Sequence, residues 1–511
     1  MIRKSSNHSI PKSSNAHGHR RNPHAETATG YRYPPGLEHN LLWYALRKFR
    51  PADPIALFSH LAEKHGDIAH YRLGPEHIVF INHPDYIREI LVVQHENFIK
   101  ERTQQRTKML LGNGMITADG HTHRAQRRAA QPAFHRQRIT AYADVMVEHT
   151  ARMISTWRDG QTRDIAQDMM QLTMGIVAAT LFGTELGPEG AELNDAVNTI
   201  MRDYTFLVAL PAAELLLYFP FPQLRRFRRA RSRLDKTVYR LIDDHRSKLS
   251  HAAYDGSGAS SPDLLAMLMA PRPDATGAIH APSDDELRDE ILTVILAGYE
   301  TVTNALTWTF YLLSQNPEIE RRLQTEIDTA LDGRNPTLDD VPRLRYTEMV
   351  LAESMRLYPP AWAMGRRALN DFSLGPWRFP ARTTVLMSQY ILHRDPRYWH
   401  QPLAFLPERF SVEQQSVGAG RAPSGANSPA TSTAYIPVIK SAGVPRFCYF
   451  PFGAGPRQCI GESFAWMEGI LTLAAIAQRW RLRLVPGHPV EPQPLITLRP
   501  KYGMKMTLEE R

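Results

Sequence analysis

An uninterrupted helical pattern over residues 284–315 constrains the fold of this chain more than any other feature. Ser283 and Glu286 form a capping-box pattern at its start, and Pro317 closes its far end. Thirty-two residues at 1.5 Å each make a helix ~48 Å long. Its middle, Ile291–Ala297, is apolar on nearly all sides. The sequence therefore predicts one helix that crosses a whole domain with its centre buried.

The rest of the sequence predicts a mainly α fold with small β-sheets. Residues 67–82 contain two β-rich runs around Gly74-Pro75, which is typical of a hairpin, and residues 83–95 predict a short helix. Helical patterns dominate between about residues 141 and 315. We expect a disordered basic tail over residues 1–33, a single domain over 34–511, and a flexible insertion over about 411–437.

Most of the net charge of +9 lies in the first fifty residues. That stretch holds nine Lys and Arg against two Glu, which gives +7, and the remaining chain is near balance. A nucleic-acid-binding role therefore has little support, because it needs a basic face on the folded domain.

Cysteine content and hydropathy bear on where the protein works. Two cysteines in 511 residues exclude a disulfide framework and favour a reducing compartment, so we expect a cytoplasmic location. No segment is long and apolar enough to span a bilayer. The nearest candidate, Phe206–Phe221, is interrupted by two prolines and an acid and is followed by four arginines. We expect an apolar helix–loop–helix there, with a membrane-surface contact as the alternative.

One cysteine lies in a glycine-rich loop that leads into an apolar helix: Phe452-Gly453-Ala-Gly-Pro-Arg457-Gln-Cys459-Ile-Gly461. The glycines allow the backbone to approach its neighbours closely. Backbone N–H groups at the helix start can point at the sulfur and, with the charge of Arg457, favour the thiolate. Such a thiolate is a good ligand for haem iron, and a structural cysteine beside a turn is the alternative.

Two further patterns have both a structural and a functional interpretation. Glu353 and Arg356 share a helix face, so they can form an ion pair that is either an ordinary surface pair or part of a buried network. Ala297-Gly-Tyr-Glu300-Thr301 places a glycine, an acid and a hydroxyl inside an apolar helix, which is costly. It predicts either a helix bend with Thr301 bonded to a backbone carbonyl, or a small pocket for dioxygen and water.

Taken in order, these patterns resemble the motifs of the cytochrome P-450 family. The cysteine loop matches F-x-x-G-x-R-x-C-x-G, and the helix matches A-G-x-[D/E]-T, at every specified position. By this resemblance Arg409 completes a Glu–Arg–Arg network with the E-x-x-R pair. The basic segment over residues 120–135 resembles W-x-x-x-R, where Arg127 fits the Arg and His123 stands in place of the usual Trp. The resemblance covers residues 120–469, most of the chain beyond the tail.

The resemblance implies a long central helix over haem b, with Cys459 as the axial thiolate. It implies that Thr301 positions proton donors for dioxygen and that Glu300 delivers protons from solvent. Arg127, His123 and either Arg366 or Arg367 would bind the propionates, with spacing slightly in favour of Arg366. The remaining cofactor contacts would be Arg457, Phe452, Gly453, Gly461 and Ala297, and the structural network would be Glu353, Arg356 and Arg409.

The resemblance also implies a monooxygenase that hydroxylates a lipophilic small molecule with one atom of O2. The pocket would be lined by mainly apolar segments, which leaves fatty acids, terpenoids and steroids open: residues 107–117, 206–210, 361–365 and 495–498. Electrons would come from a separate acidic ferredoxin- or flavodoxin-type donor, and we expect a monomer. The alternatives are a peroxide-driven haem-thiolate enzyme and a non-catalytic haem-binding sensor, which would need neither Thr301 nor an electron donor.

Overall fold

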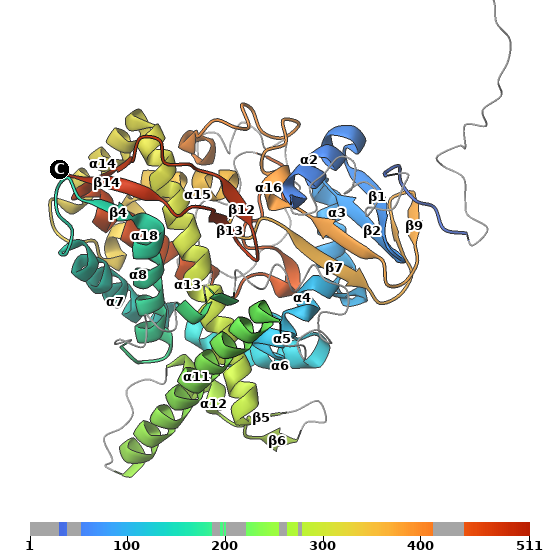
Figure 1. Cartoon of the computed structure of the whole chain (residues 1–511), viewed down its shortest axis with the longest axis horizontal. Coiled ribbons are helices and arrows are strands. Elements are labelled where there is room, and N and C mark those ends of the chain that lie inside the picture. Colours follow the sequence, from blue (N-terminus) through green and yellow to red (C-terminus); the bar gives the residue numbers. More distant parts are fainter. Residues whose placement is uncertain are drawn as a thin grey trace, which may run out of the picture.

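The computed structural model divides the molecule into a helix-rich side and a sheet-rich side, with α13 (Asp284–Gln315) passing between them (Figure 1). It confirms the mainly α fold with small sheets that the sequence predicts. None of the described helices is long and apolar enough to cross a membrane. The structure describes residues 30–37, 53–185, 195–197, 199–200, 221–254, 263–273, 278–411 and 444–511.

The long central helix has the bounds that the sequence predicts. Its capping box is formed, because Ser283 Oγ accepts from the Glu286 N–H at 3.2 Å and the Glu286 carboxylate accepts from the Ser283 N–H at 2.9 Å. The other described helices are α2 (Pro54–His65), α3 (Pro84–Arg88), α4 (Arg102–Arg106), α5 (Lys108–Leu111), α6 (Gly120–Ala130), α7 (Arg136–Ile154), α8 (Ile165–Leu181), α11 (Pro222–Tyr254), α12 (Leu264–Met269), α14 (Pro317–Leu331), α15 (Arg345–Leu357), α16 (Gln389–Leu392) and α18 (Glu462–Ala477).

Gly298 lets a neighbouring helix approach the centre of α13. A Cβ at this position would lie 2.9 Å from Val177 Cγ2 on α8, which is closer than Cβ atoms normally come to another atom. The α-helix continues unbroken through Gly298. Close packing against α8 therefore accounts for the glycine. The predicted hydrogen bond from Thr301 back to a carbonyl of the preceding turn is present, at 2.7 Å to Ala297.

Five strands form the main sheet, in the order β1-β2-β10-β7-β3. The predicted hairpin is confirmed, because β1 and β2 are antiparallel on either side of Gly74. The predicted helix over 83–95 is α3, continued by a π-helical turn over Glu89–Val93. The strands of this sheet are β1 (Ile68–Leu73), β2 (Glu76–Ile81), β3 (Phe98–Lys100), β7 (Met364–Ala368) and β10 (Thr384–Met387).

Four smaller sheets complete the described part of the fold. They comprise β11 (Trp480–Leu484), β14 (Lys505–Glu510) and β4 (Thr162–Asp164); β12 (Pro492–Pro494) and β13 (Leu498–Pro500); β5 (Arg272–Pro273) and β6 (Ile279–His280); and β8 (Phe372–Leu374) and β9 (Trp377–Phe379). The end of the predicted tail contacts β9, because the Arg32 N–H donates to the Arg378 carbonyl at 3.1 Å. Residues 1–29, 201–220 and 412–443, which hold most of the predicted tail, apolar segment and insertion, lie outside the described residues.

A fully buried ion pair holds α15 against the chain that precedes the cysteine loop. Arg356 binds both carboxylate oxygens of Glu353, at 2.7 and 2.8 Å, and neither side chain is exposed to solvent. Arg409 Nε lies 3.2 Å from the same carboxylate. Arg356 also donates to the carbonyls of His393, Pro402 and Ala404. The three side chains that the sequence singled out are therefore in contact, and they join α15 to residues 393–409.

Arg356 and Arg321 each pair with a glutamate three residues earlier, but only the Arg356 pair is buried, so replacing the two arginines should affect stability differently. We expect Arg356→Met to lower the free energy of unfolding by ~3–5 kcal/mol, because it leaves the Glu353 carboxylate buried without its main partner. Arg321→Met removes an exposed i,i+3 pair with Glu318 and should change it by less than ~0.5 kcal/mol. Urea unfolding followed by circular dichroism measures both, and equal losses would contradict a stabilising role for the buried network.

Candidate active site

A cavity of about 340 Å³ lies between α13 and the cysteine loop. Ala297 and Thr301 face it from α13, and Cys459 faces it from the loop before α18. Two of the four segments that the sequence predicts as pocket walls contribute apolar side chains: residues 107–117 contribute Met115, and residues 361–365 contribute Met364. The cavity therefore brings the cysteine motif and the helix motif together, although they are more than 150 residues apart in the sequence.

The third predicted wall, residues 495–498, faces elsewhere. None of these residues is among the described residues that line the cavity. The Leu495 carbonyl accepts from Trp362 Nε1 and the Leu498 carbonyl from Trp308 Nε1, each at 2.9 Å. This segment therefore holds two tryptophan side chains in place. The remaining predicted wall segment, residues 206–210, lies outside the described residues.

The cysteine loop is tightly folded. The Cys459 N–H donates to the Phe452 carbonyl at 3.0 Å, which closes the loop before α18 begins. Gly455 has φ +71°, and a Cβ at this position would lie 2.0 Å from the Leu91 carbonyl oxygen. No other residue type fits there without moving the backbone. The loop thus presents the Cys459 sulfur to the cavity, where it is exposed.

The loop alone does not hold an ionised sulfur. Burial raises the pKa of the Cys459 thiol to about 11, although the Gly461 N–H and the charge of Arg127 favour the thiolate. Arg457, which the sequence suggested as the supporting charge, binds Asp119 Oδ1 at 2.6 Å and the Ala118 carbonyl at 3.2 Å instead. A metal ion bound to the sulfur would supply the positive charge that the thiolate needs.

Five basic side chains gather on the wall of this cavity: Lys100, His123, Arg127, Arg366 and Arg457. Three of them donate to backbone carbonyls: Lys100 to Met115 at 2.6 Å, Arg127 to Gln458 at 2.6 Å, and Arg366 to Gly365 at 2.8 Å. Within the described chain, the Asp119 carboxylate alone forms an ion pair with this cationic cluster, through Arg457. The cluster therefore gathers more basic groups than the carboxylates of the described chain balance.

The pKa values of the cluster show the same imbalance. Burial lowers the pKa of every member. Burial and the neighbouring cations bring the pKa of His123 to about 3, that of Lys100 to about 6 and that of Arg366 to about 10. A bound ligand with two carboxylates would reverse these shifts. The residues therefore fit a dianionic group placed beside the thiol.

Strand register decides between the two candidate arginines of β7. Arg366 is opposite Lys100 in the antiparallel pair of β3 and β7, and both side chains are buried on the cavity side. Arg367 faces away and donates to the Arg382 carbonyl at 3.4 Å. The sequence analysis missed Lys100. It lies on β3, where side chains alternate across the strand, so that Phe98 and Lys100 are buried on one side and Ile99 between them is partly exposed.

Thr301 and Glu300 face different cavities although they are adjacent in the sequence. Thr301 Oγ1 donates to the Ala297 carbonyl at 2.7 Å and lies on the thiol side. The buried Glu300 carboxylate accepts from Thr497 Oγ1 and from Arg499 Nε, the latter at 2.8 Å. Burial, the largest single effect, lowers the pKa of the Arg499 guanidinium, but Glu300 and Tyr299 together outweigh it, so that the pKa is raised. Glu300 lines a second, polar cavity of about 320 Å³, so α13 separates the two.

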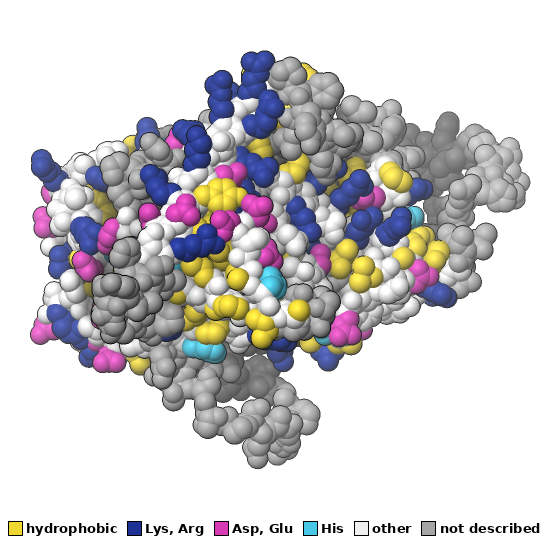
Figure 2. Space-filling view, turned by 90° about the horizontal axis from the view of Figure 1, so that it is seen from below, with side chains coloured by type: hydrophobic (Ala, Val, Ile, Leu, Met, Phe, Trp, Pro, Cys, Tyr) yellow, Lys and Arg dark blue, Asp and Glu magenta, His cyan; other side chains and the backbone are white. Residues whose placement is uncertain are grey.

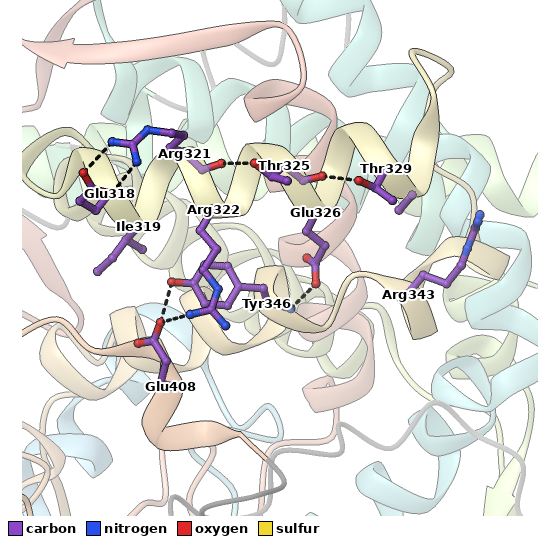
Figure 3. A pocket seen from close by; sticks show the side chains of 11 residues that line it. Glu318, Ile319, Arg321, Arg322, Thr325, Glu326, Thr329, Arg343, Tyr346 and Glu408 are labelled. Atoms are coloured by element: carbon purple, nitrogen blue, oxygen red, sulfur yellow. Dashed lines mark hydrogen bonds and ion pairs between the residues drawn. The ribbon is translucent and has the colours of Figure 1, made fainter.

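A larger hollow, of about 910 Å³, lies on the surface between α14 and α15 (Figure 3). The Glu408 carboxylate accepts from Arg322 at 2.6 Å and from the Tyr346 hydroxyl at 3.1 Å. Glu326 accepts from the Tyr346 and Thr347 N–H groups and so caps the start of α15. These groups satisfy one another, so the hollow is explained as a polar brace between helices.

The thiol, the unbalanced cations and the apolar walls together define the class of protein. A cysteine that opens on a cavity beside buried groups suited to a dicarboxylate is the arrangement of a haem-thiolate protein. The chain belongs to the cytochrome P450 family, whose model matches residues 34–507. Members of this family bind haem iron through a cysteine thiolate, and the chain is a cytochrome P450 monooxygenase.

Similar proteins support this assignment along most of the chain. Cyclooctatin synthase from Streptomyces melanosporofaciens is 37% identical, with 85% of this chain and 87% of the relative covered. Cyclooctat-9-en-7-ol 5-monooxygenase from the same organism is 35% identical, over 83% and 84%. Pentalenene oxygenase from Streptomyces avermitilis is 31% identical, over 92% and 94%. The retinoic acid-bound cyanobacterial CYP120A1 has the same fold, with a TM-score of 0.74 at 24% identity over 94% of this chain and all of that one.

The adjacent arginines of β7 provide a test of the cationic cluster. If Arg366 binds a propionate, Arg366→Leu removes a charge-assisted hydrogen bond worth ~1.5–3 kcal/mol and should speed the transfer of haem from the protein to apomyoglobin by roughly ten- to a hundredfold. Arg367→Leu is the matched control and should leave the rate unchanged, since its side chain faces away from the cavity. The assignment fails if both variants lose haem at the same rate.

Proposed function

We propose that Cys459 is the axial ligand of haem b and that the cationic cluster binds the two propionates. The observation that carries this proposal is that one cavity is lined by both the exposed thiol and five basic groups, of which Arg457 alone forms an ion pair with a carboxylate of the described chain. His123, despite replacing the usual Trp, is buried at the cavity wall and can donate one N–H as a neutral imidazole. Further contacts to the cofactor would come from Phe452, Gly453, Gly461 and Ala297.

Bound there, haem with a thiolate ligand supplies the activation of dioxygen, and the protein orients the substrate and the protons. The Thr301 hydroxyl donates its own proton to the Ala297 carbonyl, so its lone pairs are left to accept from a water in the cavity. That water is then oriented as a proton donor. Glu300, on the polar side of α13, supplies protons from the second cavity. Thr301 and Glu300 are accordingly the proposed catalytic residues.

The substrate is proposed to be a cyclic terpene or terpene alcohol. The walls of the cavity away from the cationic cluster are mainly apolar, with Met115, Ile116, Val294, Ala361 and Met364 among them. Such walls favour a lipophilic ligand. The names of two relatives specify pentalenene and cyclooctat-9-en-7-ol, which favours this class over fatty acids and steroids. A shift of the ferric haem to high spin on titration with such compounds, and not with fatty acids, would support it.

Removing one hydroxyl should uncouple electron use from product formation. In Thr301→Ala, the ratio of product formed to NAD(P)H consumed is expected to fall by roughly tenfold or more, because the oriented proton donor is lost. Thr307→Ala is the control, since Thr307 also donates to a carbonyl four residues back but lies outside the cavity. An unchanged ratio in Thr301→Ala would contradict the catalytic role and favour a sensor. Failure of the wild type to form any product would likewise favour a sensor over an enzyme.

The electron donor is proposed to be a separate, acidic ferredoxin- or flavodoxin-type protein. Arg124 and Arg128 are exposed on α6, the helix that also carries Arg127 of the cluster. Arg457 is engaged with Asp119, so the exposed pair on α6 is the better docking surface. The low cysteine content supports a cytoplasmic location, and the match of one family model to residues 34–507 supports a single domain over residues 34–511. We propose that this domain acts as a monomer.

Docking by charge makes electron transfer sensitive to salt. The rate at which a reduced acidic ferredoxin reduces the ferric haem should fall as ionic strength rises, because salt screens the attraction that steers association. Arg124→Gln combined with Arg128→Gln should lower the rate at low salt and flatten this dependence. Lys64→Gln, which removes an exposed cation from α2, is the control. Stopped-flow absorbance measures the rate, and a salt-independent wild-type rate would disprove the docking surface.

A further inference from the structure

Helix α11 presents two chemically distinct faces. One face is a continuous apolar stripe that is buried in the molecule: Leu224, Phe227, Ala230, Leu234, Val238 and Ile242. The middle of α11 is also joined to the start of α13, where Arg288 binds Asp235 and Tyr239 binds Asp285. The helix is therefore fixed to the body of the protein by one side, and among the described residues its other side is exposed.

The outer face carries a straight row of four cations: Arg225, Arg228, Arg229 and Lys236. Arg228, Arg229 and Lys236 lie three, four and eleven residues after Arg225. All four are therefore on one face of the helix, over a length of ~16 Å. All four side chains are exposed, and none makes an ion pair or a side-chain hydrogen bond within the described chain. Neighbouring arginines do form ion pairs. Arg231 Nε lies 3.6 Å from Asp235 Oδ2, and Arg233 Nη2 lies 3.1 Å from Asp195 Oδ2.

This basic row opposes the stability of its own helix. Like charges three and four residues apart repel each other, and Arg225, Arg228 and Arg229 also lie in the first two turns, where the helix dipole disfavours positive charge. Asp235 is the one acid between positions 222 and 240, and it is already bound by Arg288. The arrangement is unfavourable unless something anionic lies against the helix.

We propose that the basic row of α11 binds the surface of a membrane that contains anionic phospholipids. A straight row of guanidinium groups on a projecting ridge can reach a flat array of phosphates, and Lys and Arg gather on such a ridge at the upper edge of the view in Figure 2. A pocket that binds one acidic side chain would instead be concave.

The contact is peripheral and electrostatic. The apolar stripe of α11 is buried in the protein, so the helix cannot insert that face into the acyl chains as an interfacial helix does. Binding therefore depends on the charge of the lipid and is reversed by salt. The inference does not rest on the proposed monooxygenase substrate, because it concerns the outer face of the protein.

The experiment is co-sedimentation of the full-length haem-loaded protein with vesicles. The protein should bind vesicles of equimolar phosphatidylcholine and phosphatidylglycerol at low salt, and should not bind phosphatidylcholine alone. In the variant with Arg225→Gln, Arg228→Gln, Arg229→Gln and Lys236→Gln, partitioning should fall by roughly a hundredfold or more, since each cation near an anionic surface contributes about fivefold. Glutamine keeps a high helix propensity, so the helix itself is preserved.

A matched control and a stability measurement make the outcome decisive. A second variant neutralises four exposed cations elsewhere, and should bind like the wild type: Lys64→Gln, Arg72→Gln, Arg88→Gln and Arg158→Gln. The α11 variant should unfold at the same or a higher temperature, because it removes repulsion. Equal vesicle binding by both variants, or no binding by the wild type, would overturn the inference. The inference would also be overturned if the α11 variant kept its binding to vesicles and lost binding to an acidic ferredoxin instead. Because no turnover is measured, failure here leaves the proposed function untouched.

Discussion

The buried carboxylate of Glu353 is the constraint on which the rest of the site depends. It accepts from two guanidinium groups and from the Leu406 N–H, so it ties a core helix to an irregular segment without leaving a charge unpaired. His393, whose carbonyl binds Arg356, accepts the Phe450 N–H through its ring at 3.1 Å. The approach to the cysteine loop is therefore held by the same network, and the position of the sulfur follows from it.

The two strongest electrostatic features of the molecule are both incomplete without a ligand. At the cavity, the basic groups disfavour one another's charge and the Cys459 thiol resists ionisation, so a group with two carboxylates and a metal ion would satisfy both at once. Such a ligand stabilises the folded protein because it binds that state alone. On α11 the imbalance is on the surface, where water screens it and the charge serves association more than stability.

Local patterns predicted the elements, and contacts distant in sequence decided the site. The capping box and apolar periodicity were sufficient for α13, and turn residues were sufficient for the first hairpin. The partner of Glu300 was not predictable, because Arg499 is 199 residues away and lies on a short strand with no motif of its own. Lys100 was missed for a similar reason, since a lone lysine gains meaning only when the pairing of β3 with β7 is known. The packing role of Gly298 was not predictable, because sequence alone does not show Val177 packed against it.

The register of β7 has a consequence for the engineering of this protein and for natural variation among similar chains. Side chains alternate across a strand, so an inserted or deleted residue between Pro360 and Met364 would exchange the orientations of Arg366 and Arg367. Arg366 would then face outward, and Arg367 would face the cavity from a position displaced by one residue along the strand. Grafts in the loop before this strand should therefore lengthen or shorten the loop by an even number of residues. A sequence alignment that matches the wrong one of the two arginines would score equally well and go unnoticed.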